Sequence, residues 1–130
     1  MVGVTALHLG AIVYVRDVEP MEGTVGETKT RRVILLRKCS GPDDAVPCVV
    51  IKTLRGATKE SDEIGIPWKP TGHPQTSLTS PSAAVCSWVI NVSVDGFEEY
   101  KGKCPAPLTA EIMRLVQKLA AEKANPNAGG

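Results

Sequence analysis

Residues 33–53 read VILLRKCSGPDDAVPCVVIKT, and this stretch decides the fold. The continuous apolar run 33–36 predicts a strand that is buried on both faces. Residues 40–44, SGPDD, are typical of a tight reversal of the chain. Residues 46–53 then supply a partner strand with β-branched residues at its centre. The stretch therefore predicts an antiparallel hairpin in the middle of a mainly β protein.

Three further apolar segments flank this hairpin, at residues 9–15, 64–68 and 83–94, which gives about five strands. Pro67 cannot donate to a sheet ladder and therefore places the segment 64–68 at an edge. The longest segment, 83–94, is expected to be central. Residues 16–30 are polar and broken by proline and glycine, so we expect a long, mobile connection there, a candidate flap over a site.

The C-terminal part of the chain predicts one amphipathic helix. Pro105 and Pro107 end the strand region, and Thr109 is a candidate helix cap. The apolar residues that follow recur at helical spacing: Ile112, Leu115, Val116 and Leu119. The sequence thus predicts an α+β fold, a small and strongly bent sheet or barrel with a helix on one side. Residues 1–124 are expected to form a single domain, and residues 125–130 a flexible tail.

Composition restricts the class of protein. The 130 residues are 42% hydrophobic and 22% charged, as in ordinary globular proteins. No apolar stretch approaches the roughly 18 residues that span a bilayer, and no secretion signal opens the chain, so we expect a cytoplasmic protein without a membrane partner. The net charge is only +1. Because each neutralised phosphate needs a cation, any contact with nucleic acid must be a local patch.

The four cysteines, Cys39, Cys48, Cys86 and Cys104, are scattered and form no C-x-x-C pair. This spacing favours reduced cysteines in the core over a zinc site or a disulfide scaffold. The sequence predicts neither a metal site nor a cofactor.

Several short segments together resemble the MazF/PemK family, small toxins that cut single-stranded RNA and are held inactive by an antitoxin. Residues 10–15, GAIVYV, are similar to the opening strand of that family. Residues 30–36, TRRVILL, resemble its arginine entering an apolar strand, and residues 49–54, VVIKTL, its strand ending in a hydroxyl residue. Residues 101–103 lead into the predicted helix as in the family. The resemblance covers residues 7–119.

The resemblance implies an SH3-like β-barrel, a homodimer, and sequence-specific cleavage of RNA by metal-independent transesterification. Arg31 and Thr53 are the implied catalytic residues, since an arginine fork holds phosphate oxygens and a hydroxyl can orient the same group. They are expected at the same open end of the hairpin. The candidate substrate-binding residues, chosen from their own chemistry, are Arg32, Lys52 and Arg55 for positive charge, Trp68 as a face on which a base stacks, and His73 as an acid or base.

A second hypothesis is a catalytically inactive SH3-like barrel that binds protein or nucleic acid. The family's proline after the arginine and its second hydroxyl are both missing here. Arg31 and Arg32 are then solvated charges beside a strand, and Thr53 is an edge residue. Trp88, within an apolar run, is expected in the core. A gyrase-poisoning relative would need a structured aromatic C-terminus, which residues 125–130 do not offer.

Overall fold

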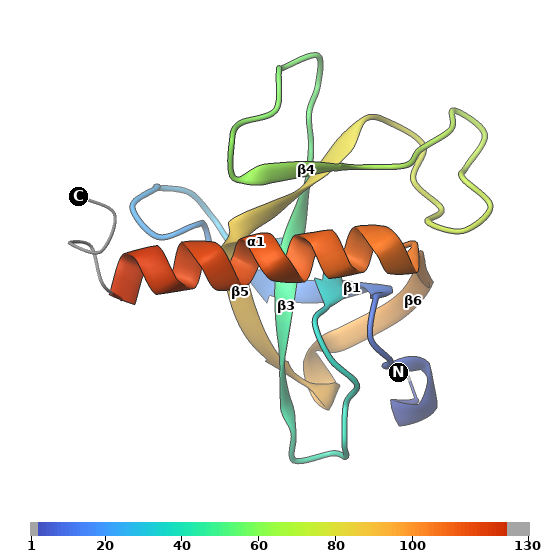
Figure 1. Ribbon diagram of the computed structural model, residues 1–130. Helices are drawn as coiled ribbons and strands as arrows, with labels where there is room; N and C mark the ends of the chain where they lie inside the picture. The colour runs from blue at the N-terminus through green and yellow to red at the C-terminus, as the bar shows by residue number, and fades with distance from the viewer. Residues whose placement is uncertain (1–2, 125–130) are drawn as a thin grey trace.

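Six strands and one long helix make up the described part of the chain, residues 3–124, in a computed structural model (Figure 1). The strands are β1 (Ala11–Val18), β2 (Lys29–Leu35), β3 (Ala45–Thr53), β4 (Glu63–Ile66), β5 (Ser82–Ser93) and β6 (Phe97–Lys103). Short 3-10 turns, η1 (Val4–Ala6) and η2 (Val94–Gly96), precede β1 and β6, and α1 (Ala106–Ala124) follows β6. The strands form one antiparallel sheet in the order β4-β5-β3-β2-β1-β6. The predicted mainly β fold with a C-terminal helix is confirmed.

The predicted hairpin is the pair β2 and β3, in which Val33 lies opposite Val50 and Ile34 opposite Val49. Successive side chains point to opposite faces of the sheet. Val33 and Val50 therefore belong to one buried cluster, and Ile34 and Val49 to the other. Both faces of these strands are covered, which is why their sequence is apolar without alternation.

The two faces of the sheet are covered by different elements. The helix face, which carries Ile34 and Val49, packs against α1, whose Ile112 is fully buried. Figure 1 shows α1 lying across the sheet. The opposite face, here called the inner face, packs against Leu7 and Phe97, and no residue of α1 belongs to its buried cluster. Since α1 does not cover the inner face, the sheet curves so that its own strands help to bury that face.

The prediction of about five strands is wrong by one, because β6 is missing from it. Its sequence, FEEYKGK, has the exposure pattern of an edge strand, with charged side chains in solvent, so no apolar run marks it. Gly102 is needed in this strand for close packing. A Cβ there would lie 2.4 Å from the carbonyl oxygen of Gln75. The 67–81 loop therefore lies directly on β6, and the amide of Lys103 donates to the same carbonyl at 2.8 Å.

The helix begins three residues before the predicted cap, at Ala106. Pro107 fits the first turn, where a missing N–H costs no hydrogen bond. Thr109 is inside the helix and buried, and its hydroxyl donates back to the carbonyl of Pro105 at 3.1 Å. The predicted tail, residues 125–130, lies outside the described residues.

Strand β5 carries a wide irregularity opposite β3. Val49 pairs with Val89, whereas the next residue, Val50, pairs with Val85. Residues 86–88 of β5 therefore have no partner on β3. Such bulges redirect side chains and are common beside functional sites. Here the bulge carries Trp88, which packs only partly against the inner-face cluster.

Candidate functional site

Arg31 and Lys52 lie on the inner face, where β2 begins and β3 ends. Arg31 lies two residues before Val33 and Lys52 two residues after Val50, so both belong to the face of that pair. Both line one pocket of about 320 Å³, here called the Arg31 pocket. Its other sheet residues are Lys29, Glu63, Val85 and Trp88, and its loop residues are Pro20, Met21, Thr24, Val25, Gly26 and Glu27.

Trp88 holds the guanidinium group of Arg31 in place. The Arg31 Cζ atom lies 4.9 Å from the centre of the Trp88 ring, a cation–π contact. The β5 bulge makes this contact possible because it takes Trp88 out of the ladder with β3. The sequence favoured Trp68 as the stacking tryptophan and Trp88 as a core residue. In the structure Trp88 lines the pocket, while Trp68 is 41% exposed and outside it.

The charge of Arg31 is not neutralised by a direct partner. Within residues 3–124, no ion pair involves Arg31, and its Nε atom is buried without a hydrogen-bond partner. A buried donor without a partner costs free energy, which the stacking on Trp88 offsets in part. An arginine in this state keeps its charge available to an anion, and the planar fork suits phosphate.

A buried carboxylate lies beside these cations. The Glu63 side chain is only 4% exposed, and its Oε2 atom lies 2.5 Å from Nζ of Lys52. Its Oε1 atom accepts the backbone N–H of Glu60 at 2.8 Å. A buried ion pair stabilises a fold little compared with apolar residues of the same size, so its position in a pocket is a reason to consider chemistry.

Glu63 is not among the site residues predicted from the sequence. One signal could have identified it: Ile64 and Ile66 alternate with Gly65, so a strand there places Glu63 on the face opposite the two isoleucines. In the structure Ile64 and Ile66 pack on the helix face, and Glu63 reaches the Arg31 pocket.

The connection between β1 and β2 covers the pocket. The strands extend further than predicted, so the loop is 19–28 rather than 16–30. Residues 22–28 are exposed, and Val25 is fully exposed. Only Pro20 and Met21 are partly buried. The predicted flap thus has a position over a pocket and few contacts that hold it there.

Thr53 does not join this site. It follows Lys52 directly in a regular part of β3, where Lys52 lies opposite Ala83 and Thr53 opposite Ser82. Adjacent strand residues point to opposite faces, so Thr53 points away from Arg31. The two lie at the same end of the hairpin, as expected, but on different faces of the sheet.

The other predicted substrate-binding residues also lie outside the Arg31 pocket, with the exception of Lys52. Arg32 points to the helix face, and its Cζ lies 5.1 Å from the centre of the Tyr14 ring. Arg55 is exposed in a turn with a φ of 50°. His73 organises its own loop, since its Nδ1 accepts the N–H groups of Gln75 and Thr76.

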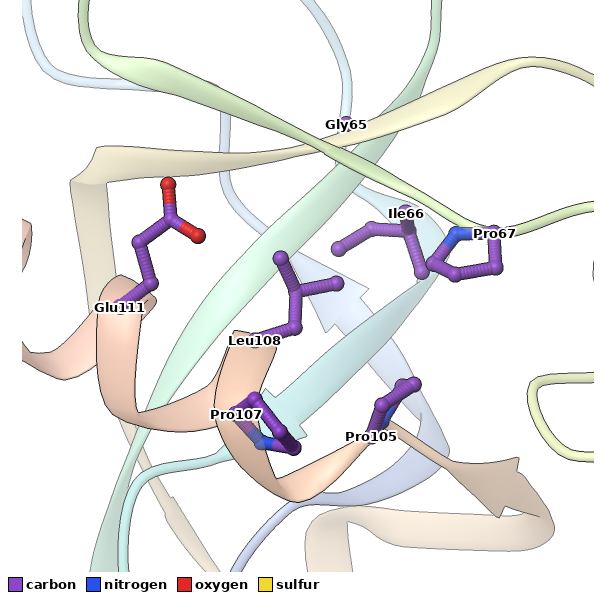
Figure 2. Close-up of a pocket in the computed structure, with 7 residues that line it drawn as sticks. All are labelled: Gly65, Ile66, Pro67, Pro105, Pro107, Leu108 and Glu111. Carbon is purple, nitrogen blue, oxygen red and sulfur yellow. The ribbon is translucent and has the colours of Figure 1, made fainter.

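A separate pocket opens between β4 and the start of α1 (Figure 2). Its walls are mainly apolar, and Glu111 is the charged residue among them. Figure 2 shows Leu108 and Ile66 pointing into this space from the helix and the strand. Without a cation or a hydroxyl group, this pocket offers nothing to hold a phosphate, and the Arg31 pocket is the better candidate.

The four cysteines are free and buried, as predicted. Burial raises the pKa of Cys48 to about 12, so its thiol stays protonated and unreactive. Within residues 3–124, His, Cys, Asp and Glu side chains form no group of three that could hold a metal ion. In the same part of the chain, no helix is long and apolar enough to cross a membrane. A comparison of the sequence with protein-family models finds no match, and neither does a comparison with curated proteins.

Proposed function

We propose that the chain binds single-stranded RNA at the Arg31 pocket and cleaves it by transesterification, as a sequence-specific toxin of the MazF/PemK kind. The observation that carries this proposal is the state of Arg31. Its guanidinium group is oriented by Trp88 and has no ion-pair partner within residues 3–124. It stands beside the pair Lys52 and Glu63 in one pocket.

The reaction needs donors for the phosphate and an acceptor for a proton. The 2′-oxygen of the RNA attacks the adjacent phosphorus, and the bond from phosphorus to the 5′-oxygen breaks. Arg31 donates to the non-bridging oxygens, where negative charge develops. Glu63 takes the proton of the 2′-hydroxyl, and the ion pair with Lys52 orients this carboxylate. The departing 5′-oxygen takes a proton from water, and the hydroxide that remains takes back the proton held by Glu63. The products are a 2′,3′-cyclic phosphate and a free 5′-hydroxyl.

The remaining parts of the proposal follow from the same resemblance. The bent sheet with both faces buried is compatible with an SH3-like barrel, and the proposal includes that fold. It also includes a homodimer in the cytoplasm and an antitoxin protein that binds the toxin. A small acidic protein encoded beside this chain would support the antitoxin.

A second candidate function is RNA binding without cleavage. The position of Thr53 favours it, because the hydroxyl that the family resemblance pairs with the arginine points to the other face. The Arg31 pocket contains one threonine, Thr24, whose hydroxyl donates to the carbonyl of Met21. The phosphate would then meet Arg31 without a catalytic hydroxyl.

Purified protein and a single-stranded RNA of mixed sequence test the proposal. We expect cleavage with 2′,3′-cyclic phosphate ends, and Arg31→Ala should lower kcat/KM by roughly 100- to 1,000-fold, the effect of removing one preorganised donor. Arg32→Ala is the matched control, since this neighbour points to the opposite face and contacts Tyr14. It should retain activity within a few-fold.

Three results separate the alternatives. Equal losses in Arg31→Ala and Arg32→Ala would indicate general attraction of charge and contradict a site at Arg31. RNA binding that depends on Arg31, without any cleavage, would support the second candidate function. Protein that neither binds nor cleaves RNA would overturn both.

A further inference from the structure

A larger groove lies next to the Arg31 pocket. It has a volume of about 800 Å³ and runs between the 19–28 loop, residues 86–90 of β5 and the C-terminal half of α1. Pro20, Met21 and Trp88 line both spaces, so the two are adjacent. Figure 1 shows the light-blue loop between β1 and β2 beside the C-terminal end of α1. We call this space the Trp88 groove.

The lining of the Trp88 groove differs in chemistry from that of the Arg31 pocket. Its walls are mainly apolar: Met21, Trp88, Val89, Ile90, Val116, Leu119 and Ala120. Its one cation is Lys123, which lies 3.2 Å from Glu22 across the mouth. Glu19 and Glu22 also line the groove, so its lining has no net positive charge for a phosphate. Its volume lies in the range of pockets that hold small molecules.

The β5 bulge shapes both spaces at once. Residues 86–88 leave the ladder with β3, and the Ser87 hydroxyl donates to the carboxylate of Asp62, which holds the bulge in place. The amide of Cys86 also donates to the carbonyl of Asp62 at 2.8 Å. Val89, just after the bulge, is 39% exposed although it is a large apolar residue in a strand. An apolar wall beside a cationic pocket fits a ligand with both kinds of surface.

We infer that the Trp88 groove is a nucleobase subsite for the RNA whose phosphate is held by Arg31, an inference that rests on the proposed function. Single-stranded RNA alternates charged phosphates with flat, largely apolar bases. The cationic Arg31 pocket and the apolar Trp88 groove are likewise neighbours, and Trp88 lines both. Proteins that bind single strands combine a cationic track with aromatic and apolar surfaces for the bases.

A second copy of the chain is the main competing occupant. The family resemblance implies a homodimer, and such a dimer would need apolar surface to bury. In the structure residues 83–86 are buried within the protomer, so Val89 is the large apolar residue of that segment that is most exposed. That small patch is adjacent to a cationic pocket, which fits a phosphorylated ligand better than an apolar face of a second protomer.

The experiment compares a short single-stranded RNA probe of mixed sequence with a set of abasic versions of it. Each version has the same number of phosphates and lacks the base of one nucleotide, at a different position in each. Wild-type protein should bind the intact probe roughly 10- to 100-fold more tightly than the version abasic at one position, from the value of stacking one base. Val89→Asp should lose this difference and bind both probes alike. Asn91→Asp is the matched control, because it adds the same charge on the same strand outside the groove.

Val89→Thr, which removes apolar surface without adding charge, replaces Val89→Asp if that variant does not fold. It should reduce the difference in affinity between the intact and abasic probes. Equal binding of intact and abasic probes by the wild type would overturn the subsite while RNA binding itself stands. A wild-type dimer that Val89→Asp dissociates would show that a second copy occupies the groove, and would also overturn it. Failure to bind either probe would instead overturn the proposed function.

Discussion

The consecutive residues Arg31 and Arg32 show how one strand position decides a residue's role. Both stack on an aromatic ring, Trp88 and Tyr14 respectively, and both have a buried Nε without a partner within residues 3–124. Only Arg31 enters a pocket that also holds a carboxylate. Since strand side chains alternate, the sequence pair RR places one arginine on each face. The role proposed for Arg31 thus depends on the face of the sheet that it occupies, and not only on its being an arginine.

The pair of Lys52 and Glu63 predicts a specific pattern of stability. Lys52→Met leaves the buried Glu63 carboxylate without its partner and should lower the free energy of unfolding by about 1–3 kcal/mol. Glu63→Leu should cost less, because the Lys52 side chain is 34% exposed and reaches water. The double variant should recover most of the loss. Urea unfolding measures all three proteins.

The control for this cycle is an exposed ion pair. Lys123 lies 3.2 Å from Glu22, and their side chains are 80% and 89% exposed, so Lys123→Met should change the unfolding free energy by less than about 1 kcal/mol. A double variant of Lys52 and Glu63 that is less stable than both single variants would contradict the view that the pair is kept for chemistry.

At the scale of elements, the turn between β2 and β3 is held by one carboxylate. Asp44 accepts two hydrogen bonds from Arg37, at 2.6 and 2.8 Å, and others from the amide and hydroxyl of Ser40. The hydrogen bonds from Arg37, followed by the amide of Ser40, hold the pKa of Asp44 well below its usual range. The order of the 36–44 turn therefore depends on an ionised Asp44.

This lowered pKa predicts a loss of stability in acid. The contribution of Asp44 is fully present above its ordinary pKa of about 4 and is lost as the pH falls through the lower pKa of the folded state. Between about pH 5 and about pH 2, thermal melts of the wild type should lose more stability than melts of Asp44→Asn. Asp43→Asn is the control and should follow the wild type. Identical acid dependence of the wild type and Asp44→Asn would contradict the role of Asp44.

The 19–28 loop predicts a ligand-dependent change in hydrogen exchange. Its exposed residues 22–28 should exchange rapidly in the free protein, because only the bond from the Thr24 amide to Met21 protects a backbone group there within the described residues. Single-stranded RNA should slow this exchange, and should not do so in Arg31→Ala. Exchange in the free loop as slow as in residues 33–35 of β2 would contradict a flap.

At the scale of the whole molecule, the sequence predicted the elements with strong patterns and missed those with weak ones. The hairpin 33–53 was predictable because apolar residues occupy both of its faces. The helix was predictable because apolar residues form a stripe along one side of it. Strand β6 was not, because an edge strand with solvent on one side needs few apolar residues.

The site was predictable only in part, for a related reason. Motif resemblance pointed to Arg31 and Lys52, which do meet in one pocket. It also pointed to Thr53, whose direction is set by the register of β3 with β5. Trp88 depends on a bulge and Glu63 on a four-residue strand, both of which arise from tertiary pairing. The bulge has no local sequence signal, and the alternation in residues 63–66 gives the face of Glu63 but not the pocket that it enters.

The central claim is that a phosphate of single-stranded RNA binds at Arg31, against Trp88. The chain has two tryptophans, so Trp68→Phe leaves Trp88 as the single indole reporter. In that protein, titration with single-stranded RNA should change the tryptophan emission saturably, and adding Arg31→Ala should remove the change. Trp88→Phe, which reports on Trp68 alone, should show none. RNA binding that changes the emission of Trp68 and leaves that of Trp88 constant would contradict the account.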